Sequence, residues 1–350
     1  MNPYNFVRIN WDNPPERRRP LFWDRFQGLA GRIEGRIVAE TALLVRGNDD
    51  EHQQGGFVRN SAGQEIIPGS SLKGLIRAVV EIVGNGCWHR YTGRYRMFPE
   101  RRDDRRLLDL SKHLPEDFYP CRDKNSLCIA CRLFGFTGRE NAYAGAVSFN
   151  DAVCVERRPF QSGYLPPLMP PKPRHSAWYT PDRQRLAGRK LYYHQRAVQI
   201  TQSGPRGNGR RVQPLGPGSK FVFTVQFSQV DPRDWPVLLY ALVLEDTMRH
   251  KLGYGKPVGL GTVRIELTRL ELIDLAARYR SNAQPTIYEG DALVQYVAST
   301  IAPIVSNRDS VTLNDLRSIW AWPPKHARHA YPTREWFARY PQASIEETGS

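Results

Sequence analysis

Three cysteines lie close together near the middle of the chain, and they constrain its fold more than any other feature. Cys121 is followed by Cys128 and Cys131, and the last two have the spacing that lets both sulfur atoms reach one tetrahedral Zn²⁺ ion. A redox pair and chance packing are the alternatives, but a redox pair normally opens a helix in a βαβ unit and has little need of a third cysteine. The spacing therefore predicts a structural zinc site within a segment of about 85–135.

A tetrahedral zinc site needs a fourth ligand, and the candidates lie upstream. Cys87 and His89 are the nearest in sequence, and His113 is the third. Cys154 lies in an apolar run that is typical of a strand, and we interpret it as a buried thiol. The predicted metal ligands are Cys87, Cys121, Cys128 and Cys131, with His89 as the alternative to Cys87.

A turn followed by a helix is predicted upstream of the cysteines. Pro68–Gly69 is a turn signal, and Ser70 or Ser71 can act as the N-cap. Apolar residues then recur at helical spacing: Leu72, Leu75, Ile76, Val79, Val80 and Val83. A helix start attracts anions, and Lys73 and Arg77 lie four residues apart on one face. Ser70, Ser71, Lys73 and Arg77 are therefore candidate phosphate contacts, and the alternative is a capped amphipathic helix with two solvated cations.

The charge of the chain favours a polyanionic partner. The formal net charge is +15, with a pI of about 9.8, and the excess is made mostly of arginine, which suits phosphate recognition. Aromatic residues make up 11%, so partners for base stacking are available. No apolar run approaches the roughly 18 residues of a membrane span, and the N-terminus lacks a signal-peptide pattern. Five clustered cysteines argue against a secreted disulfide framework, so we expect a cytoplasmic protein.

Two halves of the chain show the same order of elements. A strand is predicted between about Gly31 and Arg46, before the helix that starts near Ser71. In the second half, strict alternation over Phe221–Phe227 predicts a half-buried strand, which a helix with apolar positions up to Leu244 follows. A glycine-rich loop and a strand at 263–267 come next. The sequence therefore predicts an α+β fold built from two strand–helix units.

Two further segments are candidate RNA contacts. Gly253–Gly261 has four glycines in nine residues, which lets its backbone approach another chain closely, and it matches neither a P-loop nor a dinucleotide fingerprint. Residues 157–219 are rich in proline and basic residues, and their second half, Arg196–Arg211, could be a flexible basic finger. His194, which has no evident partner, is interpreted as a surface histidine. The predicted RNA contacts in these segments are Lys251, Tyr254, Lys256, Arg206, Arg210 and Arg211.

The predicted organisation has three parts. Residues 1–30 are expected to form an N-terminal arm. Residues 31–270 form the core, with a zinc-binding insertion at about 85–135 and a basic loop insertion at about 157–219. Residues 271–350 form a C-terminal helical extension and tail.

Three motifs in this order resemble the RAMP superfamily of CRISPR-associated proteins, specifically the backbone subunits of type III RNA-guided effectors. They are Ile67–Arg77 (IPGSSLKGLIR), Cys128–Gly135 (CIACRLFG) and Gly253–Gly261 (GYGKPVGLG). The resemblance covers roughly 31–267. It implies a modified RNA-recognition (ferredoxin-like) fold with a zinc-knuckle insertion and long irregular insertions. It also implies that subunits line up along a guide RNA, into which a thumb-like hairpin of each subunit intrudes.

One departure from this family concerns catalysis. In cleaving subunits a catalytic aspartate lies in a Gly-Gly-x-Asp setting before the turn and helix, whereas this chain has Gly55-Gly56-Phe57-Val58 there. Asp49 and Asp50 lie earlier in the same loop. Either could take the catalytic role with Mg²⁺ or Mn²⁺, or the run could be a solvated acidic turn.

The resemblance therefore predicts a guide (CRISPR) RNA-binding subunit of a type III interference complex, with target RNA and other RAMP subunits as its partners. Cleavage of target RNA by this subunit stays open. One alternative is an endoribonuclease of the same superfamily that processes the guide precursor, with a general-base histidine among His52, His89 and His194. The other is a zinc-stabilised structural adaptor.

Overall fold

The computed structural model describes residues 2–22, 24–47, 55–89, 113–137, 142–166, 177–182, 184–202, 210–341 and 343–345. An eight-stranded sheet forms its centre, and every strand pair in it is antiparallel. The strands are β2 (Leu29–Ala39), β3 (Ile66–Ile67), β6 (Val147–Phe149), β7 (Ala152–Glu156), β11 (Lys220–Val230), β12 (His250–Lys251), β13 (Thr262–Ile273) and β14 (Thr286–Glu289). Their order is β12-β13-β2-β11-β7-β3, with β14 paired to β13 and β6 paired to β11.

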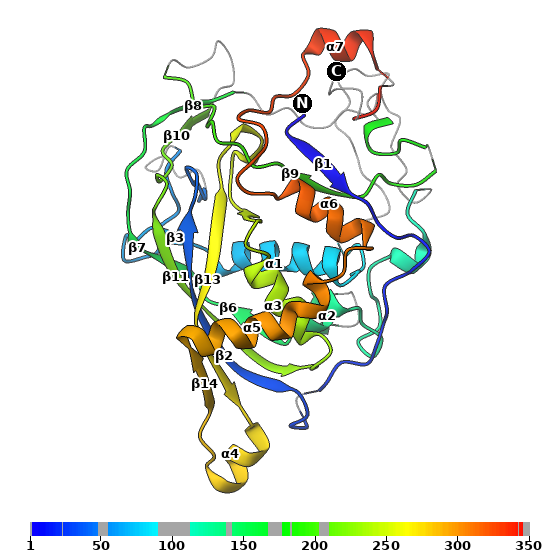
Figure 1. The fold of residues 1–350 in the computed structure, drawn as a ribbon, viewed down its shortest axis with the longest axis vertical. Helices are drawn as coiled ribbons and strands as arrows, with labels where there is room; N and C mark the ends of the chain where they lie inside the picture. The colour runs from blue at the N-terminus through cyan, green and yellow to red at the C-terminus, as the bar shows by residue number, and fades with distance from the viewer. Residues whose placement is uncertain are drawn as a thin grey trace.

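Two helices connect the central strands in the way the repeated sequence order predicts. Helix α1 (Gly69–Val83) lies between β2 and β7 along the chain, and α3 (Trp235–Val243) lies between β11 and β13. The four strands stand in the order β13-β2-β11-β7, which with these two helices is the ferredoxin-like β-α-β-β-α-β arrangement. Figure 1 shows α1 and α3 on the same side of the sheet, and they contact each other. The α+β prediction is confirmed.

Side chains alternate across the central strands. Phe221, Phe223, Val225 and Phe227 are buried against the helices, whereas Val222 and Gln226 of the same strand are exposed. Strand β2 buries Ile33 and Ile37 in the same way and exposes Arg36. Because side chains in a strand point to opposite faces in turn, the helices cover one face of the sheet and leave the other open to solvent.

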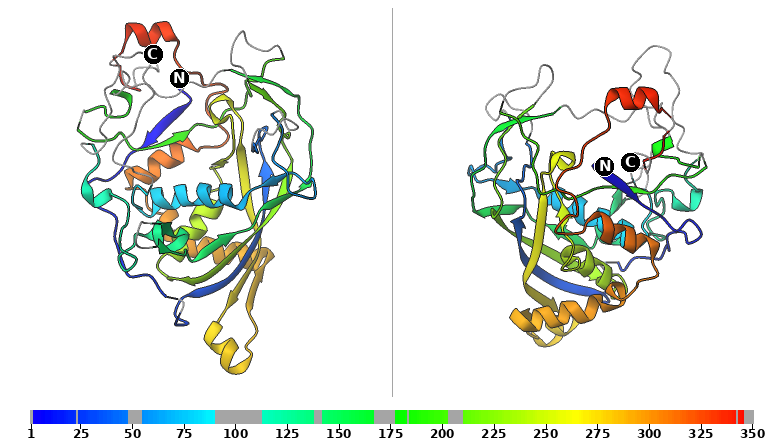
Figure 2. Two further views of the ribbon diagram at one scale, coloured as in Figure 1. Left: turned by 180° about the vertical axis from the view of Figure 1, so that it is seen from behind. Right: turned by 45° about the horizontal axis from the view of Figure 1, so that its top comes forward.

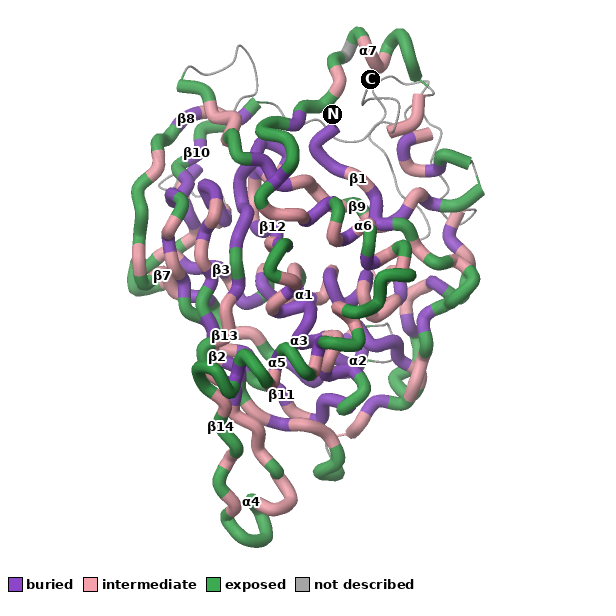
Figure 3. The backbone as a smooth tube through the Cα atoms, in the orientation of Figure 1, coloured by how far each residue is buried: buried purple, intermediate pink, exposed green. Residues whose placement is uncertain are grey.

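A long hairpin projects from the body. Strands β13 and β14 pair at one end of the sheet and are joined by α4 (Leu275–Ser281), which projects at the bottom of Figure 1. No residue of α4 is buried, as Figure 3 shows by its green and pink tube, and Tyr279 is 85% exposed. Helix α5 (Gly290–Val305) follows and packs on α3, and α6 (Val311–Ile319) contacts α1.

The first residues are packed into the protein, so the expectation of an N-terminal arm is wrong. Strand β1 (Tyr4–Val7) pairs with β9 (Arg189–Tyr192), and Tyr4 is buried next to Trp178. The two views of Figure 2 agree that β1 lies beside α6, and helix α7 (Arg334–Arg339) packs with β1 in one aromatic cluster. Local composition could not reveal this packing, because the partner strand is far away in sequence.

Short strands also interrupt the segment that was expected to be irregular. Strand β9 lies in it, and β8 (Gly163–Leu165) pairs with β10 (Arg210–Val212). Near the cysteines, a 3-10 turn (Glu116–Phe118) and α2 (Ile129–Phe134) precede the small pair β4 (Phe136–Thr137) and β5 (Ala142–Tyr143).

Candidate metal centre and nucleic-acid groove

Four cysteines come together beside the end of α1. The Sγ atoms of Cys87, Cys121, Cys128 and Cys131 all lie within 4.8 Å of one another, and all four residues are buried and free of disulfides. The Sγ atom of Cys87 is 3.7 Å from that of Cys131 and 3.9 Å from that of Cys121. Zinc–sulfur bonds of about 2.3 Å at tetrahedral angles require sulfur atoms roughly 3.8 Å apart. The cluster can therefore hold one metal ion, and its size and ligands are compatible with zinc.

Three of the four cysteines lie near the ends of helical elements, where the chain turns. Cys87 follows the end of α1, Cys121 follows the 3-10 turn, and Cys128 is the N-cap residue of α2. The backbone N–H of Cys87 donates to Cys128 Sγ at 3.4 Å, and the N–H of Cys128 donates to Cys121 Sγ at 3.2 Å. Hydrogen bonds to sulfur of this kind stabilise the thiolate form that a metal requires.

The thiols differ in acidity because they hydrogen-bond to one another. Hydrogen bonds from Cys128 and then the other two thiols lower the pKa of Cys121 far below its ordinary value. The hydrogen bond with Cys121 is in turn the main reason that the pKa of Cys131 is raised. A cysteine binds a metal ion as its thiolate, so this hydrogen bonding favours the metal-binding form of Cys121.

Neither histidine candidate belongs to the cluster. His89 Nδ1 lies 2.6 Å from Glu81 Oε1, and His113 Nδ1 lies 3.2 Å from the carbonyl oxygen of Gln184. His89 is therefore not the alternative to Cys87, because its ring faces a carboxylate instead of the thiols. Cys154 also lies outside the cluster, half-buried in β7.

A groove of about 530 Å³ lies between α1 and the glycine-rich loop. Four basic residues line it, namely Arg46, Lys190, Lys251 and Lys256, and no described carboxylate does. The aromatic ring of Tyr254 also lines it, with the Arg46 guanidinium 5.2 Å from the ring centroid. Ser71 and Gly74 of α1 form part of the opposite wall. The groove therefore unites two of the three segments that were predicted to contact RNA.

The burial of Lys251 makes the groove more favourable to an anion. This lysine is 3% exposed and donates to Thr262 Oγ1 at 3.2 Å. Burial, and next the nearby charge of Lys256, lower the pKa of Lys251 to about 7. Lys251 has no carboxylate partner among the described residues, and a desolvated ammonium group of this kind is stabilised by an incoming phosphate.

The start of α1 differs from the prediction. Neither Ser70 nor Ser71 caps the helix, which begins at Gly69 after Pro68. The N–H of Gly69 donates to Asp151 Oδ1 at 2.7 Å, so a carboxylate of the protein already occupies part of the expected anion site. Ser70 is exposed and Lys73 is half-buried, and neither lines the groove.

Arg77 is not available to RNA. Its guanidinium donates to Glu81 Oε1 at 2.9 Å, to the carbonyl oxygen of Gly135 at 2.8 Å and to Cys131 Sγ at 3.5 Å. The helical spacing correctly places it near Lys73, but the acidic residue one turn later draws it toward the cysteines. Arg77 therefore belongs to the metal centre.

The remaining predicted residues are distributed differently. Arg210 and Arg211 are exposed on β10 and do not line the groove. Arg206, Asp49, Asp50 and His52 lie outside the described residues.

The glycine-rich loop approaches its own chain, because Gly253 has a φ of +84° and a Cβ there would lie 2.4 Å from the carbonyl oxygen of Leu44.

His194 is buried, so its interpretation as a surface histidine is wrong. Its Nδ1 lies 3.0 Å from Thr262 Oγ1, and its Nε2 lies 2.9 Å from the carbonyl oxygen of Arg249. Burial, followed by the charge of Lys251, lowers its pKa well below the ordinary value. With both ring nitrogens engaged, His194 is a poor general base.

Sequence reasoning missed Lys190 and Arg46 in the groove. Lys190 is exposed on β9, and its ammonium lies 3.6 Å from the ring centroid of Tyr4 in β1. The pairing of β1 with β9 brings this lysine to the groove. No local sequence pattern predicts that position. Arg46 ends the apolar run of the first half, and its position just before a glycine-rich loop was the available signal.

The open face of the sheet is a poorer nucleic-acid surface. The outward positions of β2 and β11, both fully described, carry no aromatic side chain on which a base could stack. Outward arginines are paired with carboxylates: Arg36 with Glu266, and Arg264 with both Glu40 and Glu266. The groove, which no described carboxylate lines, is therefore the better candidate surface for an anion.

The structure combines a ferredoxin-like core, a cluster of four cysteines that could hold a metal ion, and a basic groove. A family model described as RAMP superfamily matches residues 36–264, well over half of the chain, and the chain belongs to that superfamily. Membership gives it a CRISPR-associated RNA-binding role, with CRISPR RNA and other Cas subunits as the kinds of partner. No curated protein sequence matches the chain. Among the described residues, no helix has the length and apolar character to cross a membrane.

Proposed function

We propose that this chain is a guide-RNA-binding subunit of a type III CRISPR interference complex. The groove is the observation that carries the proposal, because basic residues line it and no described carboxylate does. Its two walls, α1 and the glycine-rich loop, both lie within residues 36–264, the part that matches the family.

The proposed contacts are to the RNA backbone. A guide changes its sequence from one spacer to the next, so a subunit that holds it must bind phosphates and leave base reading to pairing. Lys190, Lys251 and Lys256 would neutralise phosphates in the groove. Tyr254 would offer a ring on which any base can stack.

The metal would have a structural role. The elements between residues 113 and 137 are short: one 3-10 turn, a six-residue helix and the two-residue strand β4. Zinc bound by the four cysteines would fasten these elements to the end of α1, and binding energy of this kind is folding energy.

The projecting hairpin is our candidate for the element that intrudes into the RNA. Its tip carries the exposed Tyr279 between Arg278 and Arg280. A ring flanked by two guanidinium groups is suited to stack on a base and to hold the adjoining phosphates.

Cleavage of target RNA by Asp49 or Asp50 with Mg²⁺ or Mn²⁺ belongs to the proposal as a separate step.

Processing of the guide precursor is the less favoured function, because His89 faces Glu81 and His194 is buried with both nitrogens engaged. A structural adaptor is disfavoured by a groove that basic residues line and no described carboxylate does.

The test is binding of several guide-length RNAs of equal length and unrelated sequence, measured by fluorescence anisotropy with the purified chain and with its assembled complex. We expect similar affinities for all sequences and a steep fall with salt. Strong preference for one sequence would contradict the proposal, and an absence of binding in both preparations would favour the adaptor.

A further inference from the structure

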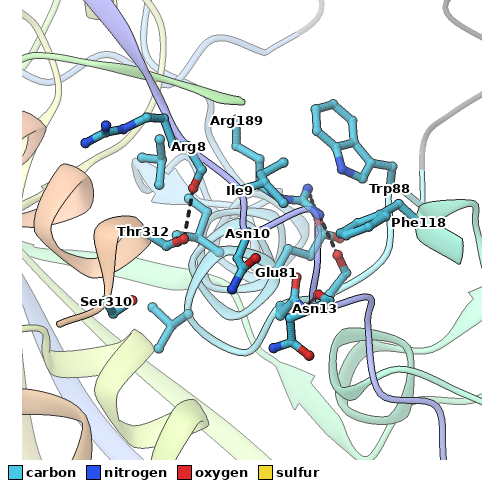
Figure 4. A pocket seen from close by; sticks show the side chains of 15 residues that line it. Arg8, Ile9, Asn10, Asn13, Glu81, Trp88, Phe118, Arg189, Ser310 and Thr312 are labelled. Carbon is cyan, nitrogen blue, oxygen red and sulfur yellow. Dashed lines mark hydrogen bonds and ion pairs between the residues drawn. The ribbon is translucent and has the colours of Figure 1, made fainter. Parts of the chain in front are cut away.

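Glu81, near the end of α1, is a buried carboxylate with three basic neighbours. It is 6% exposed and accepts hydrogen bonds from Arg77 Nε and Arg189 Nη1, each at 2.9 Å. His89 Nδ1 lies 2.6 Å away. Figure 4 shows Glu81 and Arg189 together beside Trp88, in a small pocket of about 170 Å³ between the end of α1 and the N-terminal segment. So many donors on one carboxylate fix its neighbours in a single arrangement.

Both arginines extend from Glu81 to the cysteine cluster. Arg77 Nη2 donates to Cys131 Sγ at 3.5 Å, and Arg189 Nη2 donates to the carbonyl oxygens of Gly86 and Cys87 at 2.6 and 3.1 Å. Four thiolates around one Zn²⁺ leave a net charge of about −2 in a buried place. Two guanidinium groups at this distance would offset that charge, and the backbone contact of Arg189 fixes the turn that presents Cys87.

The same residues adjoin the RNA groove. Arg189 directly precedes Lys190 on β9, and Lys190 lines the groove. Arg77 lies on α1 among residues that form the opposite wall, such as Gly74 and Ala78. Glu81 is therefore bonded to arginines of α1 and β9, two elements that contribute other residues to the groove lining.

We propose that Glu81 is a positioning residue that holds Arg77 and Arg189 around the metal centre and so couples metal retention to the geometry of the RNA groove. The coupling rests on the proposed function, whereas the effect on metal retention does not. Loss of the carboxylate charge would release both guanidinium groups. The cysteine site would then lose a sulfur hydrogen bond and the support of the Cys87 turn.

The test compares Glu81→Gln with Glu245→Gln in the full chain loaded with zinc. Glu245 is the matched control, because it is also a largely buried carboxylate that accepts from an arginine, Arg317 Nε at 2.7 Å, but has no contact with the cysteines. Zinc release into excess chelator is followed without RNA. We expect release about 10- to 100-fold faster in Glu81→Gln, the range typical of residues that orient metal ligands, and the parent rate in Glu245→Gln.

A second measurement distinguishes a role of Glu81 in positioning the arginines from a general loss of stability. In Co²⁺-substituted protein, the sulfur-to-metal charge-transfer band should shift in Glu81→Gln and in Arg77→Gln, and Arg77→Lys should restore it in part. Guide RNA should bind metal-loaded Glu81→Gln about two- to thirtyfold more weakly than the parent. A parent-like release rate and unshifted cobalt band would overturn the metal role. Parent-like RNA affinity would overturn the coupling. Failure of the parent itself to bind RNA would count against the proposed function alone.

Discussion

Arg132 and Asp234 form a buried ion pair with two contacts that joins the metal-binding insertion to the core. Arg132 Nε donates to Asp234 Oδ2 and Nη2 to Oδ1, both at 2.7 Å, and the two side chains are 5% and 1% exposed. Arg132 directly follows Cys131 in α2, and Asp234 precedes the first residue of α3. The helix that follows Cys128 and contains Cys131 is thereby fixed to a helix of the ferredoxin-like core.

The first prediction concerns this pair. Asp234→Asn should lower the free energy of unfolding by about 3–5 kcal/mol, because it leaves the buried Arg132 charge without its carboxylate. Chemical denaturation measures the effect. Asp315→Asn is the control, since its partner Arg8 is 66% exposed and such pairs contribute about 0–1 kcal/mol. Equal effects of the two substitutions would contradict the role of the buried pair.

The second prediction concerns the metal. The purified chain should contain about one zinc ion, and Cys128→Ser should lose it and unfold at a lower temperature. Cys154→Ser is the matched control, because Cys154 lies in β7 outside the cluster. Metal analysis and thermal melting with and without chelator check both variants. Unchanged zinc content in Cys128→Ser would refute the site.

The cysteine cluster could be predicted from the sequence because most of its geometry is local. Cys128 and Cys131 lie within one helical turn, and Cys121 lies a short loop away, so spacing alone indicated one site. The choice between Cys87 and His89 required the structure, in which Glu81 holds the histidine. The alternation at Phe221–Phe227 predicted β11 for the same reason, since a strand is recognised from apolar and polar residues that alternate along the chain.

The groove could be predicted only in part. Lys251 and Tyr254 lie in a recognisable loop, but Lys190 reaches the groove through the pairing of β9 with β1 across most of the chain. Arg77 shows the opposite error. Its helical position was predicted correctly, but it was assigned to RNA phosphate, whereas it contacts Glu81 and Cys131. Its acidic neighbour at the i+4 position, Glu81, was a signal within the sequence itself.

The third prediction concerns the salt dependence of RNA binding. Lys190→Met should weaken binding of every guide sequence to a similar extent and reduce the slope of log affinity against log salt by about 1, the effect of one lost phosphate contact. Arg264→Met is the control on the open face of the sheet, where this arginine already pairs with Glu40 at 3.1 Å. A larger loss in Arg264→Met would place the RNA on the sheet instead of the groove.

The fourth prediction follows from the lowered pKa of Lys251. The folded protein releases this proton at about pH 7, whereas the unfolded chain holds it to the ordinary value of 10.5. Between these values the unfolded state binds more protons, so the contribution of Lys251 to stability rises with pH, by at most about 1.4 kcal/mol per pH unit. The unfolding free energy of the parent, relative to that of Lys251→Met, should therefore increase from pH 7 to pH 9. A difference that does not change with pH would contradict the assignment.

The last prediction concerns cleavage of target RNA. An aspartate on the loop before β3 could hold a divalent cation and activate a ribose 2′-hydroxyl for in-line attack on the adjacent phosphate. An acidic run close to a polyanion is unfavourable unless a cation mediates, so any cutting should require Mg²⁺ or Mn²⁺ and stop with chelator.

The assembled complex is the form in which to measure this activity, on an RNA complementary to the guide. We expect Asp49→Ala or Asp50→Ala to remove one cut from a regularly spaced series and to leave guide binding unchanged. Asp309→Ala is the control, because this exposed aspartate lies in the C-terminal part of the chain, beyond the residues that match the family. A complete series of cuts in both loop variants would leave the chain as a guide-binding subunit that does not cut, in agreement with its Gly55-Gly56-Phe57-Val58 segment, which lacks the aspartate of the cleaving subunits.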